Sequence, residues 1–514
     1  MTGHRDGLGG LARLGAAGLL AAMAAIGLAV FGFARGTWAV GGSDSSCYGL
    51  MADAFARGRL QPSTPLVSAA PWPDAAVTFA PGGFIPSPIH PDAAAPICAP
   101  GMSVLMAPLA ALFGADAIFS LTPIAAATLV WCAFLIARRY AGGAAGVTAA
   151  ILTATSPIVL YQSVQPMNDV VTAALWLLAI ATIRRGAIAG VCVGVAILVR
   201  PNLAPLAALV AALPLVDADR DAAARWRQAM AVVIGAMPGV IGVLLLNRAL
   251  YGGMLTTGYG SAAQLFGTQY VRENVANYGR AFAQTQYLVP ALALLAPVVL
   301  DRAHRGASLL LLAFAGAVTA IYLLYRPLPE WWYLRFLIPA LVVLIVLTSA
   351  VMVRLVSRMG MSGLVPIIAV LLGILGTRVA GERQAYRLQQ MEGRYRHSGE
   401  IVRDRLPRNA VVITEWESGS IRFHAGRDVV LWQSMDPAWL DRAIAWLRSQ
   451  GLQPYLLFER GEERSFRDRF RGQSEVGALD WPPRFDINRQ VRIYDPADRA
   501  GFLDGSSYAT ENIR

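Results

Sequence analysis

The sequence predicts an α-helical protein that crosses a membrane many times and carries a small α/β domain at its C-terminal end. Of its 514 residues, 55% are hydrophobic and only 15% are charged, whereas a soluble domain carries about 25% charged residues. Apolar runs recur along the first 380 residues, and runs of about 20 residues can span a bilayer. Residues 381–514 are charged, with short strand-like runs. We therefore expect two domains, residues 1–380 in the membrane and residues 381–514 outside it.

About eleven apolar segments qualify as spans by length. The first, at residues 11–33, is longer than the apolar core of a signal peptide, so we expect an uncleaved anchor. The segments at 186–199 and 203–216 are short and could form a broken or re-entrant pair. The remaining expected spans are 117–137, 143–160, 169–183, 229–250, 286–300, 307–325, 336–353 and 362–379.

Arginine placement predicts the orientation of these spans. The net charge is +11 and lysine is absent, so arginine supplies every basic side chain. With the N-terminus inside, each predicted inner loop holds at least two arginines, in agreement with the positive-inside rule, and an odd number of spans places the C-terminus outside. The arginines are dispersed among loops, so nucleic-acid binding is not expected. Codon bias and loop charge explain most of them, and phosphate recognition is the alternative for a few at the outer face.

The loop at residues 36–100 is the longest polar stretch in the first half of the chain. It places Asp44 just beyond the first span, and nine prolines follow between residues 62 and 96. Proline at this density forbids long helices, and a loop of this length is typically functional. Cys47 and Cys98 bracket the loop, and a disulfide between them or two free thiols fit the sequence equally well.

The C-terminal residues alternate between strand-like and helix-like segments. We expect strands at 410–414, 428–432, 454–458 and 491–494. A helix should begin after Asp436, which is followed by proline, and stop before Gly451; a second is expected at 462–471. No glycine-rich phosphate loop follows a strand, so no nucleotide site is expected, and a structural or acceptor-docking role is the stronger interpretation.

No motif indicates metal or hydrolase chemistry. None of the five histidines stands at metal-ligand spacing with another, and the zinc-protease motif and the hydrolase nucleophile elbow are both missing from the sequence. We therefore expect neither a metal nor a cofactor.

Acids and arginines at the predicted outer face are few, which makes them informative. Asp44 follows the first span, and Asp169 begins a later one, where a helix cap or first-turn dipole partner is the alternative interpretation. Arg200 lies near membrane depth between two short apolar runs, where an ionisable group is a functional candidate. Arg335 lies in an aromatic belt, where snorkelling toward the interface is the alternative. This constellation suggests a carboxylate that deprotonates an acceptor hydroxyl and arginines that bind a lipid phosphate.

The order of these residues resembles that of C-type (GT-C) membrane glycosyltransferases that use polyprenyl-phosphate sugars. The resemblance covers about residues 10–380 and is nearest to bacterial family 39 protein O-mannosyltransferase-like and aminoarabinose transferase-like enzymes. It rests on the acid after the first span with Tyr48 four residues on, Pro-x-x-Asp at 166–169, Val-Arg-Pro at 199–201, the stretch at 251–260 that contains Tyr259, and Tyr-Leu-Arg-Phe-Leu-Ile-Pro at 333–339.

The resemblance implies a helical GT-C fold and a reaction that inverts the anomeric carbon, with Asp44 as the catalytic acid of the first loop. It also implies that Asp169 and Tyr48 contact the donor, and it adds Tyr259 to the candidate substrate-binding residues. Two departures concern the sugar. Ser45 stands where several members have glutamate, and Cys47 stands where the aminoarabinose enzymes have arginine, which argues against aminoarabinose.

We therefore predict an inverting hexosyltransferase-type enzyme in the bacterial inner membrane. It would move a sugar from a polyprenyl-phosphate donor to an acceptor hydroxyl of a protein, lipid or polysaccharide at the outer face. Asp44 would act as general base, and Arg200 and Arg335 would bind the donor phosphate. The alternatives are a transporter or flippase of lipid-linked glycans, and a non-catalytic assembly protein of the same fold.

Overall fold

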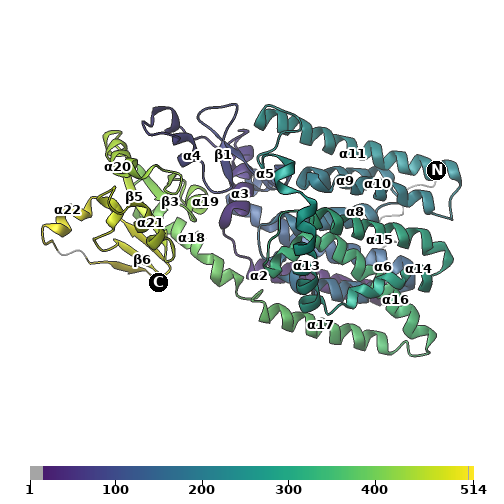
Figure 1. Cartoon of the computed structure of the whole chain (residues 1–514). Coiled ribbons are helices and arrows are strands. Elements are labelled where there is room, and N and C mark those ends of the chain that lie inside the picture. Colours follow the sequence, from purple (N-terminus) through teal and green to yellow (C-terminus); the bar gives the residue numbers. More distant parts are fainter. Residues whose placement is uncertain (1–14, 507–508, 514) are drawn as a thin grey trace. The chain divides into compact units, whose positions relative to one another are not determined.

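The computed structural model describes residues 15–506 and 509–513, most of them helical (Figure 1). Residues 11–14 of the first expected span lie outside the described residues. By its contacts the chain forms two compact units, each assembled from segments far apart in the sequence. Unit 1 contains the residues up to Gly36, Phe119–Leu244 and Ser261–Leu388, and unit 2 contains Thr37–Ile118, Leu245–Gly260 and Gln389–Arg514. The residues of the first loop, which we expected to belong to the membrane domain, thus contact the C-terminal residues.

The chain is a multi-pass membrane protein. Among the described residues, six helical stretches are long and apolar enough to cross a bilayer, and up to eight if each of two bent helix pairs counts as one span. The long stretches contain α2 (Gly15–Arg35), α6 (Leu121–Ala154), α11 (Ala222–Tyr251), α15 (Arg302–Leu323), α16 (Ile338–Arg358) and α17 (Leu364–Glu382). The expected total of eleven spans is not confirmed.

Helix α6 covers two of the expected spans. Its backbone leaves the helical region at Ala141 and Gly142, the latter with φ +76°. A Cβ on Gly146 would lie 2.9 Å from the carbonyl oxygen of Phe134, whereas twelve residues of straight helix extend about 18 Å. The chain therefore folds back at Gly142, where a positive φ suits glycine.

The segments between α6 and α11 are short helices. They are α7 (Pro157–Ser163), α8 (Asn168–Ala181), α9 (Gly186–Val199) and α10 (Leu206–Ala212). The axes of α7 and α8 meet at 114°. Pro166 precedes this bend, and Asn168 and Asp169 begin α8 directly after it. The bend thereby places two polar side chains at the start of a buried apolar helix.

The stretch between the expected spans 229–250 and 286–300 contains a helix that the sequence did not indicate. It is the sixteen-residue α13 (Val271–Gln286), which continues at 104° into η6 (Val289–Leu295) and α14 (Ala296–Val299). Tyr287 and Leu288 make the bend with positive φ angles. The polar sequence of α13 hides its helical period from a search for apolar runs, because only one narrow stripe of it is apolar.

Unit 2 is built on a six-stranded mixed sheet in the order β4-β3-β5-β7-β6-β8. Strand β3 pairs in parallel with β4 and β5, β7 pairs antiparallel with β5 and β6, and β8 lies parallel to β6. The strands are β3 (Ala410–Thr414), β4 (Asp428–Leu431), β5 (Gln453–Glu459), β6 (Phe485–Ile487), β7 (Val491–Tyr494) and β8 (Glu511–Ile513). The helices are α18 (Leu388–Arg405), α19 (Ser418–Ser420), α20 (Leu440–Ser449), α21 (Glu462–Phe470) and α22 (Asp498–Leu503).

The strands at 410–414, 428–431, 453–459 and 491–494 lie where the alternating sequence pattern indicated them. Asp436 accepts a hydrogen bond from the Ala438 amide before α20, as the helix-start signal requires. Gly451, with φ +73°, follows that helix. The placement of these residues outside the membrane remains a prediction.

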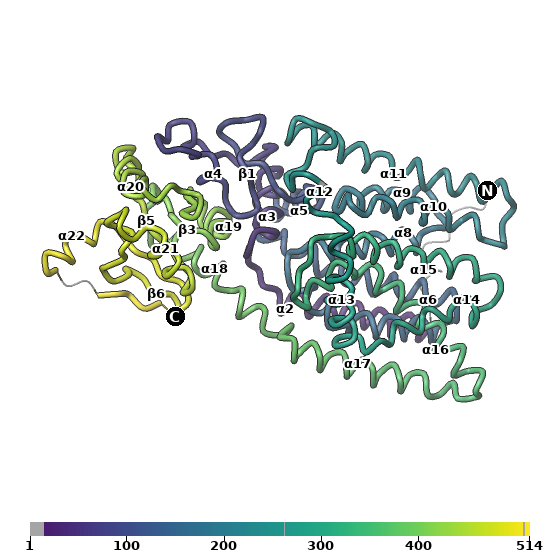
Figure 2. The backbone as a smooth tube through the Cα atoms, in the orientation of Figure 1, coloured from purple at the N-terminus to yellow at the C-terminus, as the bar shows by residue number. Residues whose placement is uncertain are grey.

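Each face of the sheet carries its own apolar core. On one face, Ile401 and Val402 of α18 pack with Val412 and Ile493. The other face is covered by α20 and α21, and also by the first loop (Figure 2). From that loop, Trp72 and Phe79, the latter in the short helix α4 (Ala75–Phe79), lie in the same cluster as Ile413 and Trp432. The first loop therefore completes the core of the C-terminal sheet.

Helix α3 (Gly42–Ala56) carries the acid that follows the first span. Asp44 lies in its first turn, so the helix begins before the acid rather than after it. Cys47 forms a disulfide with Cys98, with 6.3 Å between the Cα atoms. Cys98 comes shortly before α5 (Gly101–Phe113), and its amide donates to Cys47 Sγ. The rest of the loop contributes a two-stranded hairpin of β1 (Phe84–Pro86) and β2 (Ala94–Pro96).

Glu417 is a carboxylate buried completely inside unit 2. Its Oε2 accepts hydrogen bonds from the hydroxyls of Ser398 at 2.7 Å and Ser420 at 2.6 Å. Its Oε1 has no hydrogen-bond partner among the described residues. Burial raises the pKa of Glu417 to about 8 and outweighs the two hydroxyls; nearby Glu459 raises this pKa and Arg394 lowers it. Glu417 is therefore mostly protonated at neutral pH.

The pKa of Glu417 predicts a pH dependence of stability. Between its ordinary value of 4.5 and about 8, folded Glu417 holds a proton that the unfolded chain releases, so stability falls as pH rises through this window. Glu417→Gln keeps a neutral side chain, so thermal unfolding of the full chain in detergent should show its melting temperature rising relative to wild type from pH 5 to pH 8. Glu475→Gln, at an exposed position, is the control, and a pH-independent difference for Glu417→Gln would contradict the assignment.

The disulfide predicts a second effect on stability. Cys47 and Cys98 are 51 residues apart, and closing a loop of this length stabilises a fold by about 4 kcal/mol. Cys47→Ser combined with Cys98→Ser should lower the melting temperature, and a reductant should lower that of wild type but not of the double variant. Peptide mapping without reductant should recover the two cysteines in one linked pair, and two free thiols would disprove the bond.

Candidate functional site

Asp169 lies at the centre of the most polar part of unit 1. It stands in the first turn of α8, and its side chain is fully buried. The helix-cap interpretation is incomplete, because the carboxylate makes no capping bond and faces two arginines instead. Arg200 Nη2 lies 2.7 Å from Asp169 Oδ1, and Arg335 Nε lies 3.8 Å from Oδ2. Three of the predicted site residues thus meet at one point.

Arg200 is placed by the end of α9. The helix stops at Val199, and the following Pro201 begins a new 3-10 turn, so the Arg200 backbone leaves the helix and its side chain reaches α8. Its Nη2 also donates to Asn168 Oδ1 at 2.6 Å. Asn202, two residues on, donates to the Tyr322 hydroxyl at 3.1 Å. The short runs flanking Arg200 are therefore a broken segment. At the break, the Arg200 guanidinium group reaches the buried carboxylate of Asp169.

Aromatic rings hold the two guanidinium groups. The Arg200 and Arg335 Cζ atoms lie 5.2 and 5.1 Å from the ring centre of Phe336. Arg200 is also 5.8 Å from the Tyr322 ring, and Arg335 is 5.3 Å from the Tyr333 ring. Such contacts fix the planes of the guanidinium groups. About a tenth of each arginine side chain is exposed, so Arg335 does not snorkel away from the protein.

The charge balance of this cluster suits an anion. Two arginines, Arg200 and Arg335, face the single carboxylate of Asp169. Asp169 accepts a hydrogen bond from Arg200 and lies 3.8 Å from Arg335 Nε. A guanidinium group carries several N–H donors and is a common ligand of phosphate oxygens. Burial strengthens their attraction for a phosphate. The arrangement can therefore bind a phosphate ester through the two guanidinium groups.

Sequence reasoning missed three residues of this cluster. Asn168 stands beside Asp169, but an asparagine before a helix reads as a cap. Tyr322 lies near the end of α15, where nothing in an apolar run marks one tyrosine as special. Phe336 was noted only as part of the 333–339 motif, without a role of its own, and its shared contact with both arginines depends on tertiary packing.

The remaining predicted residues lie in unit 2. Asp44 is half-buried in the first turn of α3. Tyr48, one turn further, is buried, and its carbonyl accepts from Ser103 of α5. Tyr259 is 41% exposed in the segment that joins α11 to α12 (Ala262–Leu265). Their roles remain predictions.

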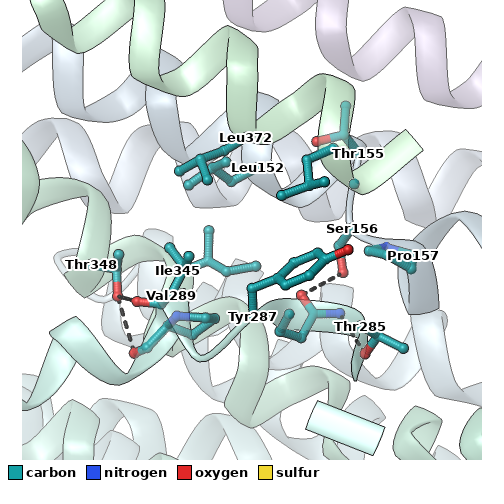
Figure 3. Close-up of a pocket in the computed structure, with 14 residues that line it drawn as sticks. Leu152, Thr155, Ser156, Pro157, Thr285, Tyr287, Val289, Ile345, Thr348 and Leu372 are labelled. Atoms are coloured by element: carbon teal, nitrogen blue, oxygen red, sulfur yellow. Dashed lines mark hydrogen bonds between the residues drawn. The ribbon is translucent and has the colours of Figure 1, made fainter. Parts of the chain in front are cut away.

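Two cavities of unit 1 are unsuited to the proposed chemistry. Figure 3 shows the first, about 50 Å³, beside the bend after α13 and bordered by Ser156, Tyr287 and Thr348. It holds at most a few waters. The second, about 260 Å³, lies at the C-terminal end of α8, away from Asp169. Its arginines are engaged: Arg139 donates to the carbonyls at the end of α8, and Arg184 and Arg220 pair with aspartates.

In the part of the chain that the structure describes, no group of three or more His, Cys, Asp or Glu side chains is arranged to hold a metal ion. The absence of a cofactor remains an expectation.

Comparison with known proteins decides the fold. No protein-family model matches the chain, and no curated protein matches it in sequence. ArnT from Cupriavidus metallidurans bound to undecaprenyl phosphate aligns with a TM-score of 0.56 at 15% identity, over 91% of this chain and 96% of that one. This chain has the GT-C fold. ArnT in the apo state aligns at 0.54 and 14% identity, over 86% of this chain and 93% of that one. The resemblance to GT-C proteins expected from the sequence is confirmed for the fold.

The buried ion-pair cluster predicts a large effect of removing its one acid. Asp169→Asn leaves two partly buried arginines without their carboxylate, and breaking such a pair typically costs about 3 to 5 kcal/mol. The melting temperature of the full chain in detergent should therefore fall clearly. Asp219→Asn, which removes the exposed partner of Arg184, should change it little, and equal effects of the two variants would contradict a central role for Asp169.

Proposed function

We propose that this protein is a glycosyltransferase that uses a polyprenyl-phosphate sugar as donor. The observation that carries the proposal is the cluster of Arg200 and Arg335 around buried Asp169 in a chain with the GT-C fold. Undecaprenyl phosphate is bound to the ArnT structure that this chain resembles. A lipid-linked phosphate ester is the ligand whose chemistry fits two guanidinium groups in a membrane protein.

The proposed reaction is one displacement at the anomeric carbon. The acceptor hydroxyl oxygen attacks that carbon from the face opposite the phosphate. A new C–O bond forms as the bond to the phosphate oxygen breaks, and its electron pair leaves with the lipid phosphate. Asp44 takes the proton of the acceptor hydroxyl. Arg200 and Arg335 stabilise the charge that grows on the phosphate, which lowers the barrier. The anomeric configuration inverts.

Asp44 is the proposed base because of its environment as well as its place after the first span. It is half-buried in the first turn of α3, so the carboxyl group is not sealed inside the protein. Asp169 is unsuited to this role, because its two oxygens face guanidinium groups and it is fully buried. The two acids therefore have different proposed tasks: Asp44 moves a proton, and Asp169 sets the phosphate site.

The proposal places the enzyme in a bacterial inner membrane with its site on the extracytoplasmic face. This placement rests on the arginine-rich inner loops and on the position of Asp44 after the first span. The acceptor would be a hydroxyl of a protein, lipid or polysaccharide. A flippase or a non-catalytic assembly protein would not need a base at Asp44.

The base is tested by Asp44→Asn. The purified variant should lose transfer from a panel of polyprenyl-phosphate sugars by at least about 100-fold, the lower end for general base catalysis, while its affinity for undecaprenyl phosphate stays near wild type. Asp53→Asn, in the same helix and paired with exposed Arg57, should keep full activity. Normal transfer by Asp44→Asn would rule out the mechanism.

The donor site is tested separately by binding. Arg200→Gln and Arg335→Gln should each weaken undecaprenyl phosphate binding at least tenfold and lower its salt dependence, while the uncharged polyprenol should bind all forms alike. Equal binding of the phosphate by wild type and both variants would remove the phosphate assignment.

A further inference from the structure

Helix α3 has little intrinsic stability around the acid that it carries. Its first five residues are Gly42, Ser43, Asp44, Ser45 and Ser46, all of which favour caps and turns over helix interiors. Gly42 has φ +70°, and no side chain caps the helix. A fifteen-residue helix is marginal alone even with good helix formers. The position of Asp44 must therefore depend on tertiary contacts, and several of these come from unit 2.

Much of that support comes from residues 417–425 of the C-terminal sheet domain, which we call the docking segment. It contains α19 and a single π turn, Ile421–Ala425. In Figure 2, α19 lies beside α3, although the two are separated by more than 360 residues. Four residues of the docking segment reach α3 or the chain next to it, and each does so by a different contact.

The closest contact is between two helices. Gly419 lies directly on Ser46, so that a Cβ at Gly419 would overlap the Ser46 Oγ and Cβ atoms. Its backbone has no positive φ, so space rather than backbone conformation requires glycine here. Phe423 packs on Gly49 one turn further, where an added Cβ would lie 3.5 Å from its ring.

The other contacts hold the chain beside the first turn of α3. Ser418 Oγ accepts from the Gly82 amide at 2.9 Å. Gly83, next in sequence, presses on the carbonyl of Ser43 so tightly that a Cβ would overlap it. His424 Nε2 accepts from the Val40 amide, two residues before the helix, at 3.1 Å. Burial lowers the pKa of His424 to about 4, so this nitrogen stays an acceptor at neutral pH.

We propose that the docking segment positions the acid-bearing turn of α3, so that Gly419 and its seat on Ser46 set the placement of Asp44 for proton transfer. The proposal rests on the function proposed above for Asp44. It assigns the C-terminal domain a positioning role in the reaction. Gly419 and Ser46 are positioning residues, because neither needs to touch the substrate.

Glu417 attaches the docking segment to the rest of the C-terminal domain. Its Oε2 holds the hydroxyl of Ser420 and that of Ser398 in α18. The turn of α19 is thus fixed to the sheet domain on one side while Gly419 faces α3 on the other. A displacement of α3 at Gly419 cannot be absorbed by α19 without breaking these bonds.

The test is a pair of matched glycine substitutions and a rescue. Gly419→Ala should lower kcat at least tenfold, since misplacing a catalytic group by about 1 Å can cost about 100-fold, with undecaprenyl phosphate affinity unchanged. Gly393→Ala in α18, where a Cβ meets nothing within 4 Å, should behave as wild type. Ser46→Gly together with Gly419→Ala removes the overlap and should restore kcat.

Hydrogen exchange gives a readout that does not depend on activity. Gly419→Ala, and the milder Ser418→Ala, should speed amide exchange in residues 42–53, whereas Gly393→Ala should not. Unchanged exchange, or faster exchange with wild-type kcat, would overturn the inference. If wild type itself transfers no sugar from any donor, the proposed function fails, and exchange still decides whether the docking segment holds α3.

Discussion

A buried carboxylate between two arginines is the interaction on which unit 1 depends. Asp169 has no exposed surface, and Arg200 and Arg335 are nearly as deep. Charges this far from water persist only when they are paired, so α8, the break after α9 and the 3-10 helix before α16 (Trp331–Leu337) must converge on one point. The bends of the chain make this convergence possible: α7 and α8 meet at 114°, and Arg200 leaves its helix just where α8 begins. The irregular segments of unit 1 therefore bring its buried polar side chains together.

Much of the fold could be predicted from the sequence because hydropathy and charge act locally. Most long spans, four strands of the C-terminal sheet and the start of α20 follow from residue patterns within about ten positions. The meeting of Asp169, Arg200 and Arg335 was predicted only as a shared membrane face. Tyr322 gave no signal, and the 333–339 motif did not indicate that Phe336 contacts both arginines. Helix α13 was missed because its polar sequence masks its period. The fold-back at Gly142 needs one left-handed glycine, which a sequence full of glycines does not single out.

The partition of the chain was the least predictable feature. A change in composition at residue 380 indicates where apolar spans end, but it says nothing about which earlier segment packs with the later residues. Trp72 and Phe79 complete one face of a sheet whose strands begin more than 300 residues later. Two aromatic residues in a proline-rich loop have no periodicity, so only tertiary structure reveals their partner. The Cys47–Cys98 bond and the Gly83 contact then tie the same loop to α3.

The contact between Gly419 and Ser46 also has a consequence for the order in which parts of the chain fold during synthesis. A ribosome delivers α3 among the first sixty residues, but the segment that supports it only after more than 350 further residues have followed. Throughout that interval the membrane helices can insert and the loop disulfide can form while the acid-bearing turn has no C-terminal support. A nascent or truncated chain would thus carry every proposed reactive group and still be incomplete. The C-terminal domain would then have to fold against α3 before the acid-bearing turn is supported.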